Sequence, residues 1–426
     1  MLSLLLRKIQ AMKNLLIIFV VFMLINSSVG CQQRDKEGFR FGADQLISDY
    51  FHLIKNKKLG IVTNHTALLS NGVHLVDTLH TLKDVKITAL FGPEHGIRGD
   101  NSAGATIKNE VDTKSGIRVF SLYGKDRKPT KEMLIDVEVL LFDIQDVGAR
   151  FYTYISTLFY TVQAAAENNI PLVLLDRPNP INGIYVDGPI RKPELSSFVG
   201  IAPLPIAHGM TVGELAKYFA GEKLIGENLT VDLKIIKMAN WDRNLFYDDF
   251  RSSWIKPSPN IPSLDAAIVY PGTCLIEGIN VSEGRGTEAP FLIIGAPYIN
   301  SRELIEEMNK YNIEGISLEP LPFTPIEIPG VVSNPKYKNE NCFGIKIKMI
   351  DRNKFESVKF GIRLISSINK LYPNELKFRD ASFDRLSGDR SIRQKIIEGI
   401  SAQQIIQSYQ SELDLFRNVR KKYLLY

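Results

Sequence analysis

The stretch Thr88-Ala-Leu-Phe-Gly-Pro-Glu-His-Gly-Ile-Arg-Gly-Asp100 begins as a β-strand and ends in a turn that carries reactive side chains. The apolar residues within 85–90 predict the end of a buried strand, and the glycines and the proline after it predict a turn. In open α/β sheets, ligands bind at this carboxyl edge. Glu94, His95 and Arg98 are therefore candidates for acid, base or anion-binding roles, although an ordinary polar turn would contain the same residues.

Residues 39–190 alternate short apolar runs with helical patterns. The run Leu59-Gly-Ile-Val-Thr63 predicts the first buried strand. Short apolar strands that alternate with helices favour a mostly parallel sheet with both faces covered. The sequence therefore predicts an α/β protein whose first domain, residues 39–265, is Rossmann-like. Further strands are predicted at residues 85–90, 117–123, 137–142 and 172–175, and a helix at residues 155–167.

Polar side chains follow four of the predicted strands, at the point where each strand ends. Because the carboxyl ends of parallel strands meet at one edge of a sheet, we expect these side chains to converge on a single site. Each also has a simpler explanation as a helix cap, a turn former or a structural ion pair. Besides Glu94, His95 and Arg98, the candidates are Asn64, His65, Asp146, Arg150, Tyr152, Tyr154, Asp176, Arg177 and Asn179.

Several common site motifs are missing from the sequence. No Gly-x-Gly-x-x-Gly run or phosphate-binding loop follows the first strand, so a nucleotide is not expected. The chain has no Gly-x-Ser-x-Gly elbow, and His65, His74 and His95 lack the spacing of a zinc protease. We therefore expect neither a cofactor nor a metal. The basic residues are dispersed, which argues against nucleic acid, while the net charge of +5 suits an anionic partner such as a cell wall or an acidic sugar.

A run rich in proline, Trp254-Ile-Lys-Pro-Ser-Pro-Asn-Ile-Pro262, follows the first domain's predicted strands. Prolines at this density hold an extended wall, on which Trp254 and Asn260 could stack against and hydrogen-bond a sugar ring. A stiff linker between domains explains the same residues equally well.

Residues 270–291 carry Glu277, Glu283 and Arg285 among several glycines. Because glycine at this frequency weakens both helix and strand, the segment predicts a binding loop. Its arginine could bind a carboxylate through two parallel hydrogen bonds, and Glu283 could hold that arginine or supply the second carboxyl of an acid pair.

The remaining chain predicts a second, smaller α+β domain, residues 266–426. Residues 343–349 alternate as a one-faced strand, and residues 355–371 and 401–423 have helical patterns. We expect this domain to close over the first.

Residues 1–30 have the layout of a bacterial export signal. Basic residues precede an apolar run at 15–25 that is short for a membrane span, and Ser-Val-Gly precedes Cys31. A cysteine there predicts a lipoprotein signal in which Cys31 is acylated and becomes the first mature residue; an ordinary cleaved signal is the alternative. We expect an exported protein, a periplasmic or outer-membrane lipoprotein. Cys274 and Cys342 are too few for a disulfide framework.

Eight of these runs, in order over essentially the whole exported chain, resemble the exo-β-N-acetylmuramidase family of peptidoglycan hexosaminidases, long known only as a domain of unknown function. The runs are Thr63-Asn-His-Thr66, Phe91-Gly-Pro-Glu-His-Gly-Ile-Arg-Gly99, Ser121-Leu-Tyr-Gly124 with Arg127-Lys-Pro-Thr130, Phe142-Asp-Ile-Gln-Asp-Val-Gly-Ala-Arg-Phe-Tyr-Thr-Tyr154, Asp176-Arg-Pro-Asn-Pro180, His208-Gly-Met-Thr211, Pro257-Ser-Pro-Asn-Ile-Pro262 and residues 277–287.

The resemblance implies a Rossmann-like amino-terminal domain, a smaller carboxyl-terminal domain and a cleft between them. It also implies release of N-acetylmuramic acid from the non-reducing ends of wall fragments, with Glu94 as the main catalytic residue. The sequence departs from the family pattern at Ile279, Leu292 and Tyr298, where a threonine, an acidic residue and a tryptophan are common. These departures concern subsites more than the reaction.

Glycoside cleavage requires a proton for the leaving oxygen and support for an oxocarbenium-like centre, normally from two carboxyl groups. We predict that Glu94 is the acid and that His95 tunes it. The second group stays open among Asp146, Glu277 and Glu283, and the substrate's own 2-acetamido group could replace it.

The lactyl carboxylate that distinguishes N-acetylmuramic acid from N-acetylglucosamine calls for a planar pair of donors. We expect Arg98, Arg150 or Arg285 to bind it. Two other functions remain as alternatives. A non-catalytic, lipid-anchored peptidoglycan-binding protein would need these contacts but not Glu94, and an amidase or esterase is disfavoured because no activated nucleophile or metal is predicted.

Overall fold

The computed structural model describes residues 38–99, 110–250 and 253–426. The predictions of a signal segment at residues 1–30 and of acylation at Cys31 lie outside the described residues. Among the helices of the described part, none is both long enough and apolar enough to cross a membrane.

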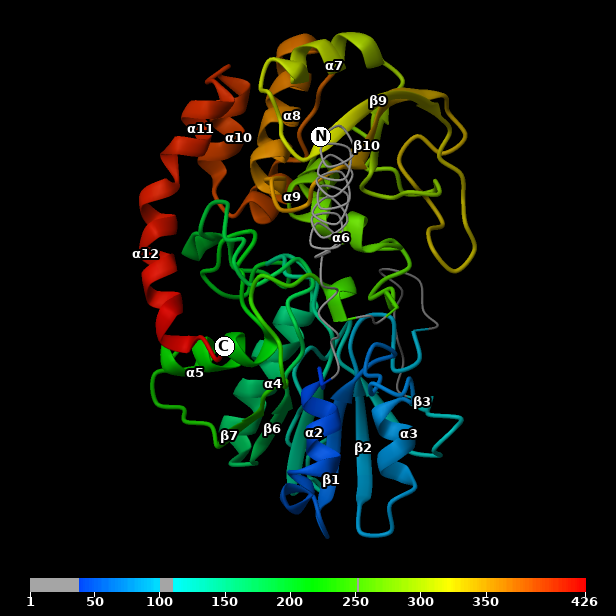
Figure 1. The fold of residues 1–426 in the computed structure, drawn as a ribbon, viewed down its shortest axis with the longest axis vertical. Coiled ribbons are helices and arrows are strands. Elements are labelled where there is room, and N and C mark those ends of the chain that lie inside the picture. The colour runs from blue at the N-terminus through cyan, green and yellow to red at the C-terminus, as the bar shows by residue number, and fades with distance from the viewer. Residues whose placement is uncertain (1–37, 100–109, 251–252) are drawn as a thin grey trace, which may run out of the picture. The chain divides into compact units, whose positions relative to one another are not determined.

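A seven-stranded sheet forms the first half of the described chain (Figure 1). Its strand order is β3-β4-β2-β1-β5-β6-β7, and every neighbouring pair is parallel except β3 with β4. The five predicted strands are confirmed to within two residues at each end. The edge strands β3 and β7 were not predicted, because both are short and partly exposed. The bounds are β1 Lys58–Thr63, β2 Lys86–Gly92, β3 Glu110–Val111, β4 Arg118–Ser121, β5 Val139–Asp143, β6 Leu172–Leu175 and β7 Leu233–Ile236.

Helices cover both faces of this sheet, as the sequence predicts. Along β5, Leu140 and Phe142 point into one hydrophobic core, whereas Val139 and Leu141 point into another. The first core contains apolar residues of α4 and α5, and the second contains those of α2 and α3. This alternation is the period of two that a strand buried on both faces requires. These helices span α2 Gly42–Ser48, α3 Leu75–His80, α4 Tyr154–Asn168 and α5 Val212–Gly221.

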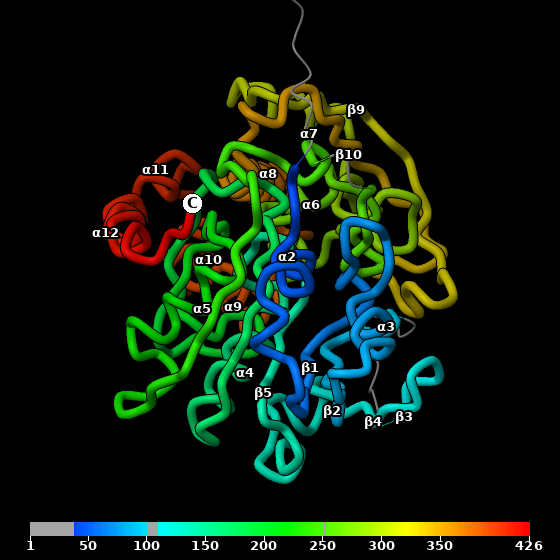
Figure 2. The backbone as a smooth tube through the Cα atoms, turned by 60° about the horizontal axis from the view of Figure 1, so that its bottom comes forward, coloured from blue at the N-terminus to red at the C-terminus, as the bar shows by residue number. Residues whose placement is uncertain are grey.

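The order of the strands reverses between β1 and β5. From β1 the chain goes to β2 and then β4 on one side of the sheet, and afterwards to β5, β6 and β7 on the other. Figure 2 shows β5, β1, β2, β4 and β3 in this order across the sheet. Thr63 at the end of β1 pairs in register with Asp143 at the end of β5. Ligand crevices in open α/β sheets form at such a point, because the loops on either side diverge.

The second half of the chain contains a three-stranded antiparallel sheet in the order β8-β10-β9, together with seven α-helices, of which α6 Leu264–Thr273 comes first. The predicted strand at residues 343–349 and the predicted helices at residues 355–371 and 401–423 are confirmed as β10, α8 and the pair α11 and α12. The bounds are β8 Ile293–Ala296, β9 Ile316–Phe323, β10 Cys342–Met349, α7 Ser301–Asn309, α8 Ser357–Leu371, α9 Asp380–Ser387, α10 Arg390–Ile397, α11 Ala402–Ser408 and α12 Gln410–Arg420.

The prediction that residues 270–291 form a binding loop is wrong for the first part of this segment, which is helical. Helix α6 spans Leu264–Thr273, and a 3-10 helix follows at Cys274–Gly278. Gly272 is there because α6 crosses α8 closely: a Cβ at this position would lie 1.9 Å from the carbonyl oxygen of Ser357. This glycine therefore permits helix packing and does not break the helix.

Histidine 74 ties the loop after β1 to the start of α3. Its Nδ1 accepts a hydrogen bond of 3.3 Å from the Val76 amide, and its Nε2 lies 2.8 Å from the carbonyl oxygen of Asn64. Only the neutral imidazole with its hydrogen on Nε2 makes both bonds. Burial lowers the pKa of His74, which favours the same neutral form.

Replacing His74 with glutamine should flatten the pH dependence of stability. Since the folded state holds His74 neutral while the unfolded state takes up a proton near pH 6.5, the native free energy of unfolding should fall as pH drops below that value. One such group contributes at most about 1.4 kcal/mol per pH unit. Urea unfolding between pH 8 and pH 5 measures this slope for the native protein and for His74→Gln.

The matched control is His80→Gln at the exposed end of the same helix, which should keep the native slope. An equal slope for His74→Gln and the native protein would contradict the assignment.

Candidate active site

The loops at the carboxyl ends of the parallel strands converge, as predicted. The amide of Gln145, after β5, donates to the hydroxyl of Thr66, after β1, at 3.0 Å. The hydroxyl of Tyr154, at the start of α4, lies 3.4 Å from the carbonyl oxygen of Glu94, after β2. These bonds join three loops that are separate in sequence into one surface at the switch point of the sheet.

Glu94 lies half-buried in the turn after β2, where two hydroxyl groups hold its carboxyl group. Thr153 Oγ1 donates to Glu94 Oε2 at 2.9 Å. The phenol of Tyr123, in the loop after β4, also hydrogen-bonds this carboxylate; burial and the charge of Glu94 raise the pKa of Tyr123 to about 12, so the phenol remains a donor. His95 adopts a φ of +74°, which is uncommon for a side chain with a Cβ and marks a constrained turn.

Thr153 occupies the N-cap position of α4 without capping the helix. A threonine there normally accepts a hydrogen bond from a backbone amide of the first turn, which is worth about 1 kcal/mol. The hydroxyl of Thr153 donates to Glu94 instead. The carboxyl group thus lies beside the amino end of a 15-residue helix, where the helix dipole favours negative charge.

Sequence reasoning missed both Thr153 and Tyr123. Each lies in a run that carries the family resemblance. The neighbouring tyrosines and arginines were the predicted site residues, because their side chains are larger or charged. An N-cap threonine looks like ordinary helix chemistry in a sequence. Only its three-dimensional partner distinguishes it from a cap.

Tyr152 and Tyr154, at the start of α4, are both buried. Their rings contact edge to face at 4.8 Å between centroids, and Tyr152 continues to Tyr270 at 6.1 Å. Tyr270 in turn lies 4.8 Å from Phe291. Burial raises the pKa of Tyr152 and of Tyr154, so both phenols stay neutral. These aromatic rings lead from the surroundings of Glu94 to the second predicted stretch.

In that second stretch, Arg285 lies over the Phe291 ring at 5.3 Å and pairs with two carboxylates. Its Nη2 is 2.6 Å from Glu277 Oε1, and its Nε is 3.4 Å from Glu283 Oε1. Lys336 Nζ is 3.1 Å from the other oxygen of Glu283. The side chain of Glu277 is 29% exposed and that of Glu283 only 5%. Glu277 is therefore the more accessible of the two carboxylates.

Asp146 lies deeper, with its side chain 8% exposed. Its Oδ2 accepts from the Gly148 amide at 2.7 Å and lies 3.7 Å from His208 Nε2. The Nδ1 of His208 accepts from the Met210 amide at 3.1 Å, which places the hydrogen of the neutral ring on Nε2, toward Asp146.

Two of the arginines predicted to bind substrate are committed to the protein itself. Arg98 makes two bonds of 2.8 Å to the carboxylate of Asp112 and a third to Asp77. The guanidinium of Arg150 is fully buried and donates to three backbone carbonyl oxygens, two from the first domain and that of Leu386 from the second. In the structure Arg98 orders its own loop and Arg150 joins the two halves of the chain, while their roles in substrate binding stay predictions.

The three polar residues after β6 also make contacts within the protein. Asp176 is fully buried and accepts from Thr211, from the Gly213 amide and from Tyr426. Arg177 forms a buried ion pair with Asp143, and its Nη2 also donates to the Leu68 carbonyl oxygen. The amide group of Asn179 donates to Met210 and accepts from Ile181. These residues fix the edge of the sheet beneath the site.

The proline-rich run closes this edge from outside. The ring of His65 is 2.8 Å from the carbonyl oxygen of Lys256. The hydroxyl of Tyr154 donates a hydrogen bond to the carbonyl oxygen of Pro257. The indole of Trp254 donates to Ile261 within the run, and Asn260 is 1% exposed. The structure thus favours the wall over a free linker. Asn64 is also buried, and its side-chain oxygen accepts two bonds from Thr66.

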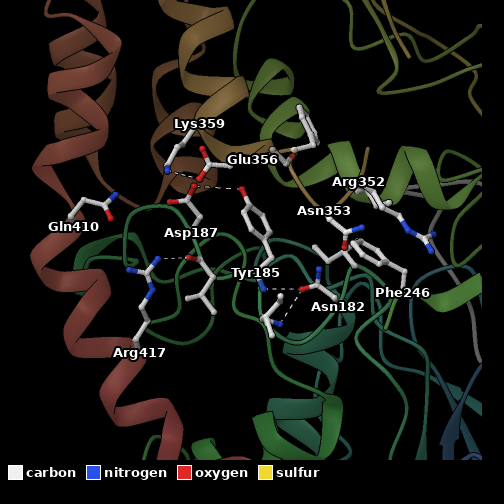
Figure 3. Close-up of a pocket in the computed structure, with 16 residues that line it drawn as sticks. Asn182, Tyr185, Asp187, Phe246, Arg352, Asn353, Glu356, Lys359, Gln410 and Arg417 are labelled. Carbon is white, nitrogen blue, oxygen red and sulfur yellow. Dashed lines mark hydrogen bonds and ion pairs between the residues drawn. The ribbon is translucent and has the colours of Figure 1, made fainter. Parts of the chain in front are cut away.

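A separate cavity of about 270 Å³ lies among the loop at residues 181–187, the segment at residues 352–359 and α12. Figure 3 shows Tyr185, Asp187 and Asn353 around it. Its cations already have carboxylate partners: Arg352 with Asp248 and Asp249, Lys359 with Glu356, and Arg417 with Asp414. None of the predicted site residues lines this cavity. Within the described ranges, no group of three His, Cys, Asp or Glu side chains is arranged to hold a metal ion.

Comparisons with known proteins agree with this architecture. The models for the N-terminal and C-terminal parts of the exo-beta-N-acetylmuramidase NamZ match residues 59–265 and 268–426. The peptidoglycan beta-N-acetylmuramidase NamZ of Bacillus subtilis is 46% identical over 396 residues, which is 93% of each chain. Two crystal structures of DUF1343 family proteins from Bacteroides fragilis have folds similar to that of this chain.

The first has a TM-score of 0.84 and 32% identity, and covers 91% of this chain and 99% of its own. The second has a TM-score of 0.72 and 33% identity, and covers 92% and 99%. Both sequence models and the curated relative agree over nearly the full described chain. The protein belongs to the exo-β-N-acetylmuramidase family.

Proposed function

We propose that this protein is an exo-acting glycoside hydrolase that releases N-acetylmuramic acid from the non-reducing end of peptidoglycan fragments. The observation that carries the proposal is the carboxyl group of Glu94, held by Thr153 and Tyr123 at the switch point of the sheet. Membership in the family and the name of the Bacillus relative support the same reaction. Neither favours the alternative of a wall-binding protein without turnover.

In this proposal Glu94 protonates the oxygen of the leaving sugar. The proton transfer leaves a carboxylate, which the hydroxyl of Thr153, the phenol of Tyr123 and the amino end of α4 all stabilise. The hydroxyls also fix the plane of the carboxyl group, so that it need not reorganise during the reaction. His95 contributes through the constrained turn that presents Glu94.

The second group of the reaction stays open among Asp146, Glu277, Glu283 and the substrate's acetamido group. We favour Glu277, because its side chain is the most exposed of the three carboxylates. Its carboxylate lies 2.6 Å from Arg285 Nη2, a contact that fixes its orientation for the role of a base or nucleophile. Glu283, between Arg285 and Lys336, then holds the arginine in place.

We also propose that the protein is exported and attached to a membrane through an acylated Cys31. The support is the sequence alone: a basic segment, an apolar run and a cysteine after Ser-Val-Gly. In cells fed with labelled palmitate, the native protein should carry the label and a Cys31→Ser variant should not. An unlabelled native protein recovered in soluble form would favour an ordinary cleaved signal.

Replacing Glu94 with glutamine should strongly reduce turnover while leaving the fold intact. Glutamine keeps the shape of the side chain but cannot donate a proton to the leaving oxygen, and loss of a general acid costs about 10²- to 10⁴-fold in rate. The measurement is release of free N-acetylmuramic acid from N-acetylmuramyl-N-acetylglucosamine. Calorimetric binding of the disaccharide is the control and should survive. No release by either protein, with binding intact, would instead support the binding-protein alternative.

Replacing Thr153 with valine should lower kcat by about 10- to 100-fold, since a hydrogen bond to a charged group contributes roughly 1.5–3 kcal/mol. KM and the melting temperature should change little, because the hydroxyl does not cap α4. Thr153→Ser keeps the hydroxyl and should restore most of the activity.

Thr161→Val is the matched control, because Thr161 bonds only the backbone of Thr157 within the same helix. It should leave kcat unchanged. If Thr153→Ser were as impaired as Thr153→Val, the role of the hydroxyl would be disproved.

A further inference from the structure

The proposed substrate carries a carboxylate for which the predicted arginines are poorly available. Arg98 donates to the carboxylates of Asp112 and Asp77. Arg150 donates to backbone carbonyl oxygens. Arg285 already pairs with two carboxylates. A guanidinium in such contacts would have to give up a partner before it could bind a ligand. A cation for the lactyl group must therefore come from another place near Glu94.

Arg127 is such a cation. It is exposed and lies in the loop after β4, four residues beyond Tyr123. Its guanidinium lies over the ring of Phe198 at 4.7 Å, and it makes no hydrogen bond or ion pair with another described residue. Its positive charge acts on Tyr123, whose phenol hydrogen-bonds Glu94. Arg127 thus lies within electrostatic reach of a direct neighbour of the catalytic carboxyl group.

The ring beneath Arg127 is anchored to the same helix as the active site. Phe198 stacks with Tyr160 of α4 at 6.4 Å and lies 6.1 Å from the ring of Tyr123. Its carbonyl oxygen accepts a 2.7 Å bond from Ser156 Oγ, also on α4. An aromatic face holds a guanidinium by its flat side and leaves the N–H groups at its edge available. Those edge donors match the two oxygens of a carboxylate.

The neighbouring lysine in this loop has a different role. Lys128 Nζ is 2.7 Å from Glu167 at the end of α4, so its charge is neutralised and it ties the loop to the helix. Among the described residues, Arg127 and Lys125 are the cations of this loop without an ion pair, and Arg127 is the one that lies over an aromatic ring.

We propose that Arg127 binds the lactyl carboxylate of the muramyl unit held at Glu94, and thereby selects N-acetylmuramic acid over N-acetylglucosamine. This proposal rests on the proposed function for the position of the substrate. It replaces Arg98, Arg150 and Arg285 as candidates for that contact. The sequence did not single out Arg127, because its partner Phe198 is 71 residues away.

The test compares an aryl N-acetylmuramide with its lactyl methyl ester, which differs only in lacking the negative charge. The native protein should prefer the free acid by about 10- to 100-fold in kcat/KM, as a charge-assisted pair implies. Arg127→Met should lower the kcat/KM for the free acid to the value for the ester. The kcat/KM for the ester should stay unchanged. Arg127→Lys keeps the charge without the planar fork and should show an intermediate preference.

Arg118→Met is the matched control. Arg118 is also an exposed arginine over a phenylalanine ring, that of Phe120 at 5.6 Å, but it lies on β4 itself. This variant should keep the native preference. A native preference retained in Arg127→Met, or an equal loss on acid and ester, would overturn the proposal.

Equilibrium binding of N-acetylmuramic acid and its methyl ester separates this proposal from the reaction. If the native protein hydrolyses neither substrate, the proposed function fails, but the affinities still decide the role of Arg127. Tighter binding of the acid that disappears in Arg127→Met supports it, and equal affinities for acid and ester in the native protein disprove it.

Discussion

The parallel pairing of β1 with β5 is the constraint on which the site depends. These strands lie in register to their last residues, Thr63 and Asp143, and the strand order reverses between them. The loops that follow must therefore leave the sheet at the same edge and diverge. The bond from the Gln145 amide to Thr66 joins the two loops immediately beyond the strands. Everything that surrounds Glu94 is built on this junction.

Buried polar groups, one of them an ion pair, hold that junction in place. The ion pair of Arg177 with Asp143 and the bonds to Asp176 lie directly beneath the loops, out of contact with water. A buried charge is tolerated only when its partners satisfy it, and removal of one partner costs about 3–5 kcal/mol. Such groups contribute little net stability compared with an apolar core. What they provide is a single allowed geometry for the loops above them.

The sequence predicted the sheet well because strand burial leaves a local pattern. Each of β1, β2, β4, β5 and β6 appears as a short apolar run, whereas the edge strand β7, Leu-Lys-Ile-Ile, is too short and mixed to stand out. The helix through Thr273 was missed because Gly272 was attributed to a loop, and its true cause is the approach of α8. Local patterns do not reveal which distant element lies against a residue.

The same limit explains the site. Glu94 could be proposed from its position after a strand, but residue type could not tell a substrate-binding arginine from a structural one. Arg150 and Arg127 are equally plausible in the sequence, and only burial and partners separate them. Thr153 is recognisable only once its hydroxyl is seen to donate to Glu94 and not to cap α4. Roles that depend on tertiary partners are the part that the sequence could not supply.

Aromatic packing connects the surroundings of Glu94 with the carboxylates around Arg285 in the second half of the chain. Glycosidases need a fixed separation of about 5–10 Å between their two carboxyl groups. Here Tyr152, Tyr270 and Phe291 lie in contact between the surroundings of Glu94 and those of Arg285. Burial keeps the phenols neutral, so these rings connect the two regions without adding a charge near either of them. Rigid apolar spacers of this kind suit a site whose chemistry depends on charge.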